Sequence, residues 1–185
     1  MALDPKKTAV LSLDIQQGIL GLVPPAQAVL PQAAQVVESA RKGGFLLIHV
    51  GLGFAPGYPE VSPQHPRISM LKERGLFILG SESAQIHPSI YQPGDLTVHK
   101  HRVSAFSGNA LEMILRSRGI ENLVLFGIAT SGIVLSTVRL ASDLDFKCVV
   151  IKDACIDSDA EVHRVLTEKV FAHQATVITA QEFQS

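Results

Sequence analysis

The sequence contains no tryptophan and only two cysteines, Cys148 and Cys155, among its 185 residues. Two cysteines are too few for a disulfide framework. Neither lies in a Cys-x-x-Cys or Cys/His pattern, so they do not predict a zinc site. Disulfide-rich secreted scaffolds and small zinc modules are therefore excluded.

An excess of charge and a long apolar run are also absent. Lys and Arg number 16 against 17 Asp and Glu, and no block of basic residues occurs, so nucleic acid and an anionic membrane surface are not expected partners. No apolar run approaches the roughly 20 residues that span a bilayer, and residues 1–16 lack a signal-peptide layout. We expect a cytoplasmic protein.

The chain has ample material for a buried core. Hydrophobic residues make up 46% and charged residues 18%, which is typical of a compact globule and not of disorder. A length of 185 residues fits one domain. We predict a single domain over residues 1–185.

Short apolar segments alternate with helical ones along the chain. Strands are predicted at 8–13, 45–50, 95–99, 122–128, 147–151 and 175–179, and helices at 31–41, 109–117, 131–144 and 158–173. The last helix is predicted to start at a Ser-x-x-Glu capping box, Ser158 to Glu161, and the proline- and glycine-rich stretch 51–66 is predicted to be a long loop. This alternation predicts an α/β fold with a parallel sheet covered on both faces.

In such a sheet the ligand crevice lies beyond the carboxyl ends of the strands. Asp14 follows the first strand, Lys100 follows the third beside two histidines and an arginine, and residues 127–132 join the fourth strand directly to a helix. A carboxylate, an ammonium group and a helix N-terminus are parts that a hydrolase uses. Taken singly, each also has a structural explanation as a helix cap, a solvated strand edge or a tight turn.

These same segments carry a resemblance to a known family. They are residues 10–16 (VLSLDIQ), Lys100 with 102–106 (RVSAF), 127–130 (GIAT) with 135–137 (LST), and 152–155 (KDAC). Together, and in this order, they resemble the isochorismatase-like (cysteine hydrolase) superfamily. The resemblance implies a three-layer α/β/α sandwich with a mainly parallel six-stranded sheet. It also implies activity on small amides or, as in isochorismatases, on a vinyl ether.

The resemblance matches Asp14 to the family's proton-handling aspartate and Lys100 to its catalytic lysine. The nucleophilic cysteine normally stands three residues after the motif threonine, where this sequence has Ile133. A covalent thioester route requires a thiolate, which isoleucine cannot supply. Cys148, inside an apolar strand, and Cys155, beyond its end, are better explained as structural residues. Ser131 is a further substitute, two residues before Ile133.

Retained Asp14 and Lys100 without a thiol fit the vinyl ether chemistry of isochorismatases, in which the aspartate acts as a general acid and water completes the hydrolysis. We therefore expect a hydrolase of a small carboxylated metabolite. Two alternatives stay open. One is an amidase with an unrecognised nucleophile such as Ser131, and the other is a catalytically silent relative that binds a metabolite or a protein.

The remaining expectations concern the binding site and its partners. Phe54 and Phe106 are predicted walls of a small-molecule pocket, and the turn residues Ala129, Thr130 and Ser131 are predicted to contact substrate. No metal is expected, because His49 lies in an apolar strand and the aspartate-with-histidine pattern of nicotinamidases is absent. No cofactor is expected. By resemblance, the protein is expected to be a homo-oligomer, a dimer or tetramer.

Overall fold

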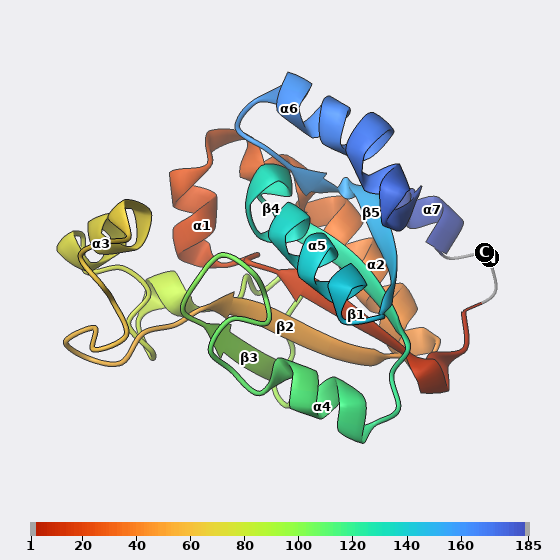
Figure 1. The fold of residues 1–185 in the computed structure, drawn as a ribbon, viewed down its shortest axis with the longest axis horizontal. Coiled ribbons are helices and arrows are strands. Elements are labelled where there is room, and N and C mark those ends of the chain that lie inside the picture. Colours follow the sequence, from red (N-terminus) through yellow and green to blue (C-terminus); the bar gives the residue numbers. More distant parts are fainter. Residues whose placement is uncertain (1–2, 184–185) are drawn as a thin grey trace.

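The computed structural model describes residues 3–183, and a parallel sheet forms the centre of this part of the chain (Figure 1). Its six strands are β1 (Thr8–Leu13), β2 (Leu46–Leu52), β3 (Leu96–Lys100), β4 (Asn122–Ile128), β5 (Lys147–Ile156) and β6 (Ala175–Ile178). They lie in the order β3-β2-β1-β4-β5-β6, and all neighbouring pairs are parallel. The predicted α/β fold with a parallel six-stranded sheet is confirmed.

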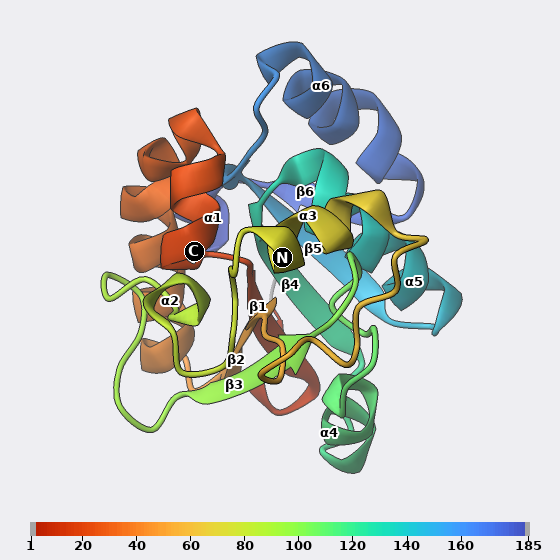
Figure 2. The same ribbon diagram turned by 90° about the vertical axis from the view of Figure 1, so that its left-hand side faces the viewer.

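Helices cover both faces of the sheet. They are α1 (Gln17–Leu22), α2 (Leu30–Lys42), α3 (Pro66–Glu73), α4 (Leu111–Ser117), α5 (Leu135–Asp143), α6 (Ala160–Val165) and α7 (Ala180–Phe183). Figure 2 shows α1 and α2 on one face and α4 and α5 on the other. All six residues of β1 are buried between these layers, as expected for the central strand of a parallel sheet. None of the helices between residues 3 and 183 combines the length and apolarity needed to span a bilayer.

The order in which strands are added to the sheet changes side between β1 and β4. After β1 the chain adds β2 and β3 on one side, and it then returns to place β4, β5 and β6 on the other. The residues that follow β1 and β4 therefore meet at the point where the strand order switches, which is the usual ligand crevice of such sheets.

Several element boundaries differ from the sequence prediction. The predicted loop 51–66 is shorter, because β2 continues to Leu52 and α3 begins at Pro66, with the His65 side chain as its N-cap. The predicted capping box is wrong, because Asp159 and not Ser158 caps α6, accepting hydrogen bonds from the backbone N–H groups of Glu161 and Val162. Strand β5 extends to Ile156 after an irregular step in its pairing with β4.

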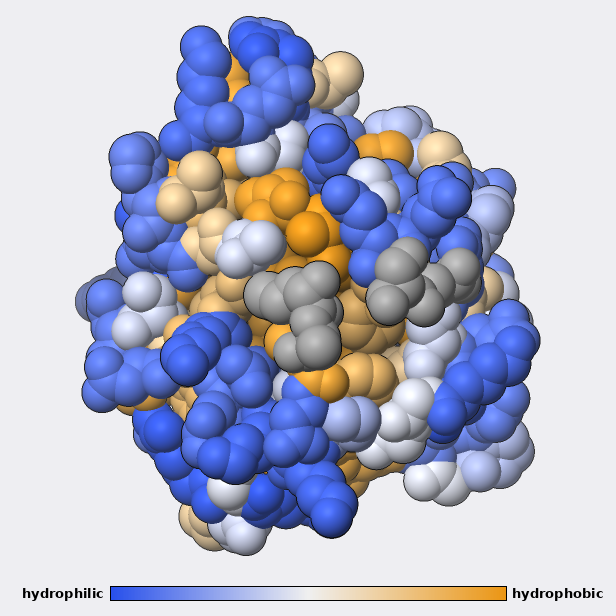
Figure 3. All heavy atoms as spheres, turned by 90° about the vertical axis from the view of Figure 1, so that its right-hand side faces the viewer, coloured by the Kyte–Doolittle hydropathy of each residue, from blue (hydrophilic) through white to orange (hydrophobic). Residues whose placement is uncertain are grey.

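Hydrophobic residues also reach the surface on one side of the molecule. In Figure 3 they form a central area with hydrophilic residues around it. A cavity of about 540 Å³ at the beginnings of β4, β5 and β6 includes Phe146, Cys148 and Val149 in its lining. Because the strands are parallel, this cavity lies at the end of the sheet opposite to the crevice.

Gly127 allows β4 to pass close to β1 near the crevice. Its φ is +147°, and a Cβ atom at this position would overlap the backbone carbonyl oxygen of Leu13. Both the backbone angle and the contact therefore require glycine. We predict that Gly127→Ala lowers the free energy of unfolding by about 3 kcal/mol.

Gly21→Ala in α1 is the matched control, because a Cβ there would meet no atom within 4 Å. It should raise stability by about 0.5–1 kcal/mol through helix propensity. Urea unfolding of both variants measures the difference. Equal effects of the two substitutions would contradict the proposed packing role of Gly127.

Candidate active site

Asp14 lies at the switch point, directly after β1. Its φ of 55° turns the chain out of the strand, and its backbone N–H donates to the carbonyl oxygen of Val50 over 2.8 Å. The carboxyl group is almost completely buried. Its Oδ1 atom has no hydrogen-bond partner among residues 3–183, so this oxygen is free to carry a proton.

Lys100 reaches the same point from the end of β3. Its Nζ atom lies 2.9 Å from Asp14 Oδ2, and the two side chains are 2% and 7% exposed. The ammonium group also donates to the backbone carbonyl of Arg102 over 3.0 Å. The structure thus brings together the two residues that the sequence matched to the family's aspartate and lysine.

Burial disfavours the charged form of both groups. It raises the pKa of Asp14 above its ordinary value, although the neighbouring Lys100 acts in the opposite direction. It also lowers the pKa of Lys100, although Asp14 opposes this shift. For both groups, the effect of burial on the pKa is larger than the opposite effect of the ion pair. Asp14 can therefore hold a proton at a higher pH than an exposed aspartate.

The turn after β4 forms the opposite wall of the site. The Ile128–Ala129 peptide bond is cis, and residues Thr130–Val134 form a wide π-type turn before α5. Ala129, Gly132 and the buried side chain of Ile133 face the same cavity as Asp14 and Lys100. The position that the resemblance assigns to the nucleophile is therefore a hydrocarbon wall of this cavity.

The cavity has a volume of about 280 Å³ and combines apolar walls with basic side chains. Its apolar walls come from α1, α3, β2, the end of β4 at Ile128 and the loop at Val103. They include Ile19, Leu22, Val23, Leu52, Ile68, Met70 and Leu71. Its charged lining residues among the described part of the chain are Asp14, Lys100, Arg67, Arg74 and Arg102. One carboxyl group thus faces four basic groups, which favours an anionic ligand.

Arg67 and Arg74 were not predicted as site residues. They come from α3 and its C-terminal cap, and no helix was predicted in this region. Arg67 lies close enough to the buried pair to lower the pKa of both Asp14 and Lys100. Within residues 3–183 neither arginine forms an ion pair.

Four residues predicted to contact substrate lie away from the cavity lining. Phe54 is fully buried, with its ring against Tyr58 and His101, and Phe106 stacks on Phe146. These aromatic contacts hold both rings in the core packing.

Thr130 and Ser131 belong to the turn, but their hydrogen-bond partners are residues that do not line the cavity. The Thr130 hydroxyl is 2.8 Å from His163 Nδ1, and the Ser131 N–H donates to Asp157. The Ser131 side chain is exposed. Of the turn residues predicted to bind substrate, only Ala129 is among the residues that line the cavity.

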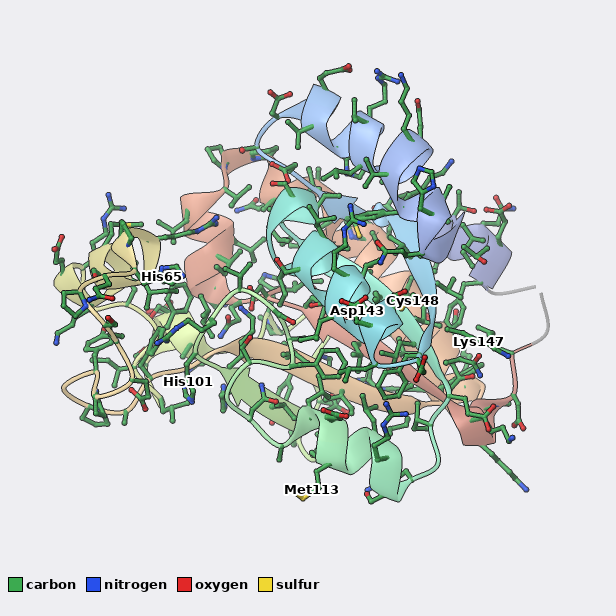
Figure 4. The ribbon with its side chains drawn as sticks, viewed as in Figure 1. His65, His101, Met113, Asp143, Lys147 and Cys148 are labelled. Carbon is green, nitrogen blue, oxygen red and sulfur yellow. The ribbon has the colours of Figure 1, made fainter. Side chains whose placement is uncertain are left out.

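Neither thiol belongs to this cavity. Burial raises the pKa of both Cys148 and Cys155 to about 12, so both are protonated near neutral pH and are poor nucleophiles. Cys148 lies at the beginning of β5, at the end of the sheet away from His101 (Figure 4). Cys155 lines a separate cavity together with Asp157 and His163.

The histidines do not assemble a metal site in the described residues. His49 is fully buried. Its Nδ1 lies 2.6 Å from Ser12 Oγ, and its Nε2 lies 3.1 Å from Asp95 Oδ2. His65 caps α3. Across residues 3–183 no group of three or more His, Cys, Asp or Glu side chains is arranged to hold a metal ion.

The fold and this cavity define a parallel α/β protein with a buried Asp–Lys pair at its switch point. The sequence model of the Isochorismatase domain matches residues 8–182. The chain therefore belongs to the isochorismatase family of hydrolases, as the resemblance predicted.

Several known proteins are similar over most of the chain. An isochorismatase family protein of Bacillus subtilis, YwoC, is 33% identical, with 98% of this chain and 94% of the relative aligned. The ureidoacrylate amidohydrolase RutB of Caulobacter vibrioides is also 33% identical, over 83% of this chain and 79% of its own. The structure of an isochorismatase family protein from Burkholderia thailandensis superposes with a TM-score of 0.81 at 29% identity, covering 97% and 94% of the two chains.

Because Asp14 and Lys100 form a buried pair, we predict that substitutions of the two residues have strongly non-additive effects on the free energy of unfolding. Asp14→Leu or Lys100→Met alone leaves one buried polar group without its partner, and each should lower the free energy of unfolding by about 3 kcal/mol. The double variant removes both groups and should recover most of this loss. Urea unfolding at pH 7 gives the four values of the cycle. Additive effects of the two substitutions would contradict a buried ion pair.

Proposed function

We propose that the protein hydrolyses a small carboxylated metabolite through Asp14 and Lys100, without a covalent enzyme intermediate. The observation that carries this proposal is the buried Asp14–Lys100 pair in a cavity whose described lining contains no thiol and has Ile133 at the family's nucleophile position. A vinyl ether is the substrate bond that these groups suit best, because its hydrolysis needs an acid and water but no nucleophilic side chain.

The reaction starts with the protonated form of Asp14. Its free Oδ1 carries the proton and gives it to the terminal carbon of the vinyl ether, which leaves an oxocarbenium ion at the ether carbon. Water adds to that carbon and returns a proton to the Asp14 carboxylate. The hemiketal then breaks its bond to the ether oxygen, which takes up the hydroxyl proton and departs as an alcohol, and a ketone remains.

Lys100 has two functions in this sequence. Its Nζ, 2.9 Å from Asp14 Oδ2, holds the carboxyl group in place. It also stabilises the carboxylate that forms when Asp14 gives up its proton. Burial raises the pKa of Asp14 and so favours the acid form that starts the reaction.

The arginines select the ligand by charge. Arg67, Arg74 and Arg102 line the cavity together with Lys100, and a carboxylate is the group that a planar guanidinium binds best. The surrounding isoleucines and leucines suit the hydrocarbon part of the ligand. We propose no metal or cofactor for this reaction, and we expect the protein to act as a homo-oligomer.

The first test is release of pyruvate from isochorismate by the purified protein. Turnover should fall at least about 100-fold in Asp14→Asn, because an amide cannot act as the general acid. The kcat/KM value should also decline as pH rises, because Asp14 loses its proton. The midpoint of this decline should lie above the ordinary aspartate pKa of about 3.9, since burial raises the pKa of Asp14.

The competing functions predict different results. With an amide substrate, intact mass spectrometry during turnover would detect an acyl adduct if an unrecognised nucleophile such as Ser131 were used. Binding without release of product would indicate a silent relative. Turnover equal to that of Asp14→Asn would refute isochorismate hydrolysis by this protein.

The arginines give a second test of the same proposal. Arg67→Gln and Arg74→Gln should each raise the KM for a carboxylated substrate about tenfold and change kcat less than about twofold, because they remove binding and leave the acid in place. Lys72→Gln is the matched control, since Lys72 is exposed on the same helix and is not a lining residue of the cavity. An equal rise in KM for the control would show only a general effect of surface charge.

A further inference from the structure

We propose that Asp157 and His163 are positioning residues, which hold the turn of Ala129 to Ile133 in the shape that the active cavity requires. This inference rests on the proposed function, because it assigns these side chains a role in that reaction. Neither residue is part of the cavity lining. They act from the opposite side of the turn.

The backbone of the turn departs from regular helix geometry. Gly132 has φ −93° and ψ −107°, which is outside helical geometry. The N–H groups of Gly132 and Val134 both donate to the single carbonyl oxygen of Ala129, over 3.1 and 3.3 Å. A segment with this backbone depends on contacts with its surroundings to keep one conformation.

Asp157 supplies the first of these contacts. Its Oδ2 accepts a hydrogen bond of 2.7 Å from the backbone N–H of Ser131, and its Oδ1 accepts one of 2.9 Å from the N–H of Ser158. Burial works to raise the pKa of Asp157, but these hydrogen bonds outweigh it, and the net pKa lies below the ordinary range. Asp157 is therefore ionised near neutral pH, and its bond to the turn is charge-assisted.

His163 supplies the second contact from α6. Its Nδ1 lies 2.8 Å from the hydroxyl oxygen of Thr130, a side chain that is fully buried. Asp157 and His163 thus hold Ser131 and Thr130, which are adjacent residues. These two contacts fix the beginning of the turn, and the following residues Gly132 and Ile133 line the cavity.

An irregularity in β5 places Asp157 beside the turn. Strand β5 pairs with β4 at Val150 and Leu125, and the next aligned pair is Cys155 and Gly127. The extra residues of β5 form a bulge before the strand pairs again. The last pair between β4 and β5 is Ile128 with Ile156. Asp157 directly follows Ile156, just as the turn directly follows Ile128, so the two lie side by side.

The residues that hold the turn and the residues of the turn itself line different cavities. Asp157 and His163 line a separate cavity of about 380 Å³, together with Cys155. Ala129, Gly132 and Ile133 line the active cavity. This arrangement separates positioning from substrate contact, so loss of the positioning bonds should reduce kcat more than it changes KM.

The test compares Asp157→Ala with Asp157→Asn and with a matched control, Asp159→Ala. Asp157→Ala removes the acceptor of the Ser131 N–H. It should lower kcat for the hydrolysis about 10- to 100-fold, with KM within about twofold of the original value. Asp157→Asn keeps an acceptor oxygen and should restore kcat to within about threefold.

Asp159 caps α6 two residues further on and is exposed. Asp159→Ala should lower the melting temperature by about 3 °C and leave kcat unchanged. Thr130→Val removes the contact with His163 and gives an independent variant in case Asp157→Ala does not fold. It should also lower kcat more than it changes KM.

Amide hydrogen exchange measures how strongly the backbone N–H groups of the turn are protected when no substrate is present. The Ser131 N–H should exchange about tenfold faster in Asp157→Ala than in Asp159→Ala, and the Ile133 methyl signals should shift only in the former. Unchanged exchange and unchanged methyl signals in Asp157→Ala would overturn the proposal, whether or not the protein hydrolyses isochorismate. A protein that lacks turnover but shows these changes would refute the proposed reaction and keep the positioning role.

Discussion

The interaction on which the site depends is an ion pair between Asp14 and Lys100 that is almost completely removed from water. Taking two charges out of water is unfavourable, and only close contact between them offsets this penalty. The surrounding backbone meets this requirement. Asp14 leaves β1 in a left-handed conformation, and Lys100 ends β3, so both side chains meet in the crevice. The same desolvation raises the pKa of Asp14, which makes it a usable acid.

The order of the strands explains why residues far apart in the sequence form one cavity. Asp14 and the turn after β4 follow neighbouring strands, because β1 and β4 flank the switch point. Lys100 comes from the edge strand β3, two positions from β1, and its long side chain spans this distance. Gly127 permits close contact between β4 and β1 at the same place. The crevice therefore depends on backbone features as much as on its functional side chains.

Asp14 and Lys100 could be selected from the sequence because each directly follows a recognisable apolar strand, and Ile133 because the family resemblance places the nucleophile three residues after Thr130. The arginines of α3 could not be selected, because α3 directly follows a stretch rich in proline and glycine, and that composition predicts a loop and not a helix. The orientation of Phe54 and Phe106 could not be predicted, because it depends on the packing of their rings against Tyr58 and Phe146 in the folded chain. The bulge in β5 was also missed, because the polar residues Lys152 and Asp153 interrupt the apolar pattern before the strand pairs again.

Ile133 affects the chemistry of the cavity in two ways. It supplies no nucleophile, and the two thiols of the chain lie elsewhere with their pKa raised to about 12, so a thioester route has no thiolate to start from. Its side chain also adds hydrocarbon to the lining of the cavity that holds the buried Asp14 carboxyl group. A thiolate at this position would place a second negative charge near Asp14, whereas isoleucine strengthens the desolvation that favours the protonated acid. The absence of the thiol and the raised pKa of Asp14 therefore both favour acid catalysis.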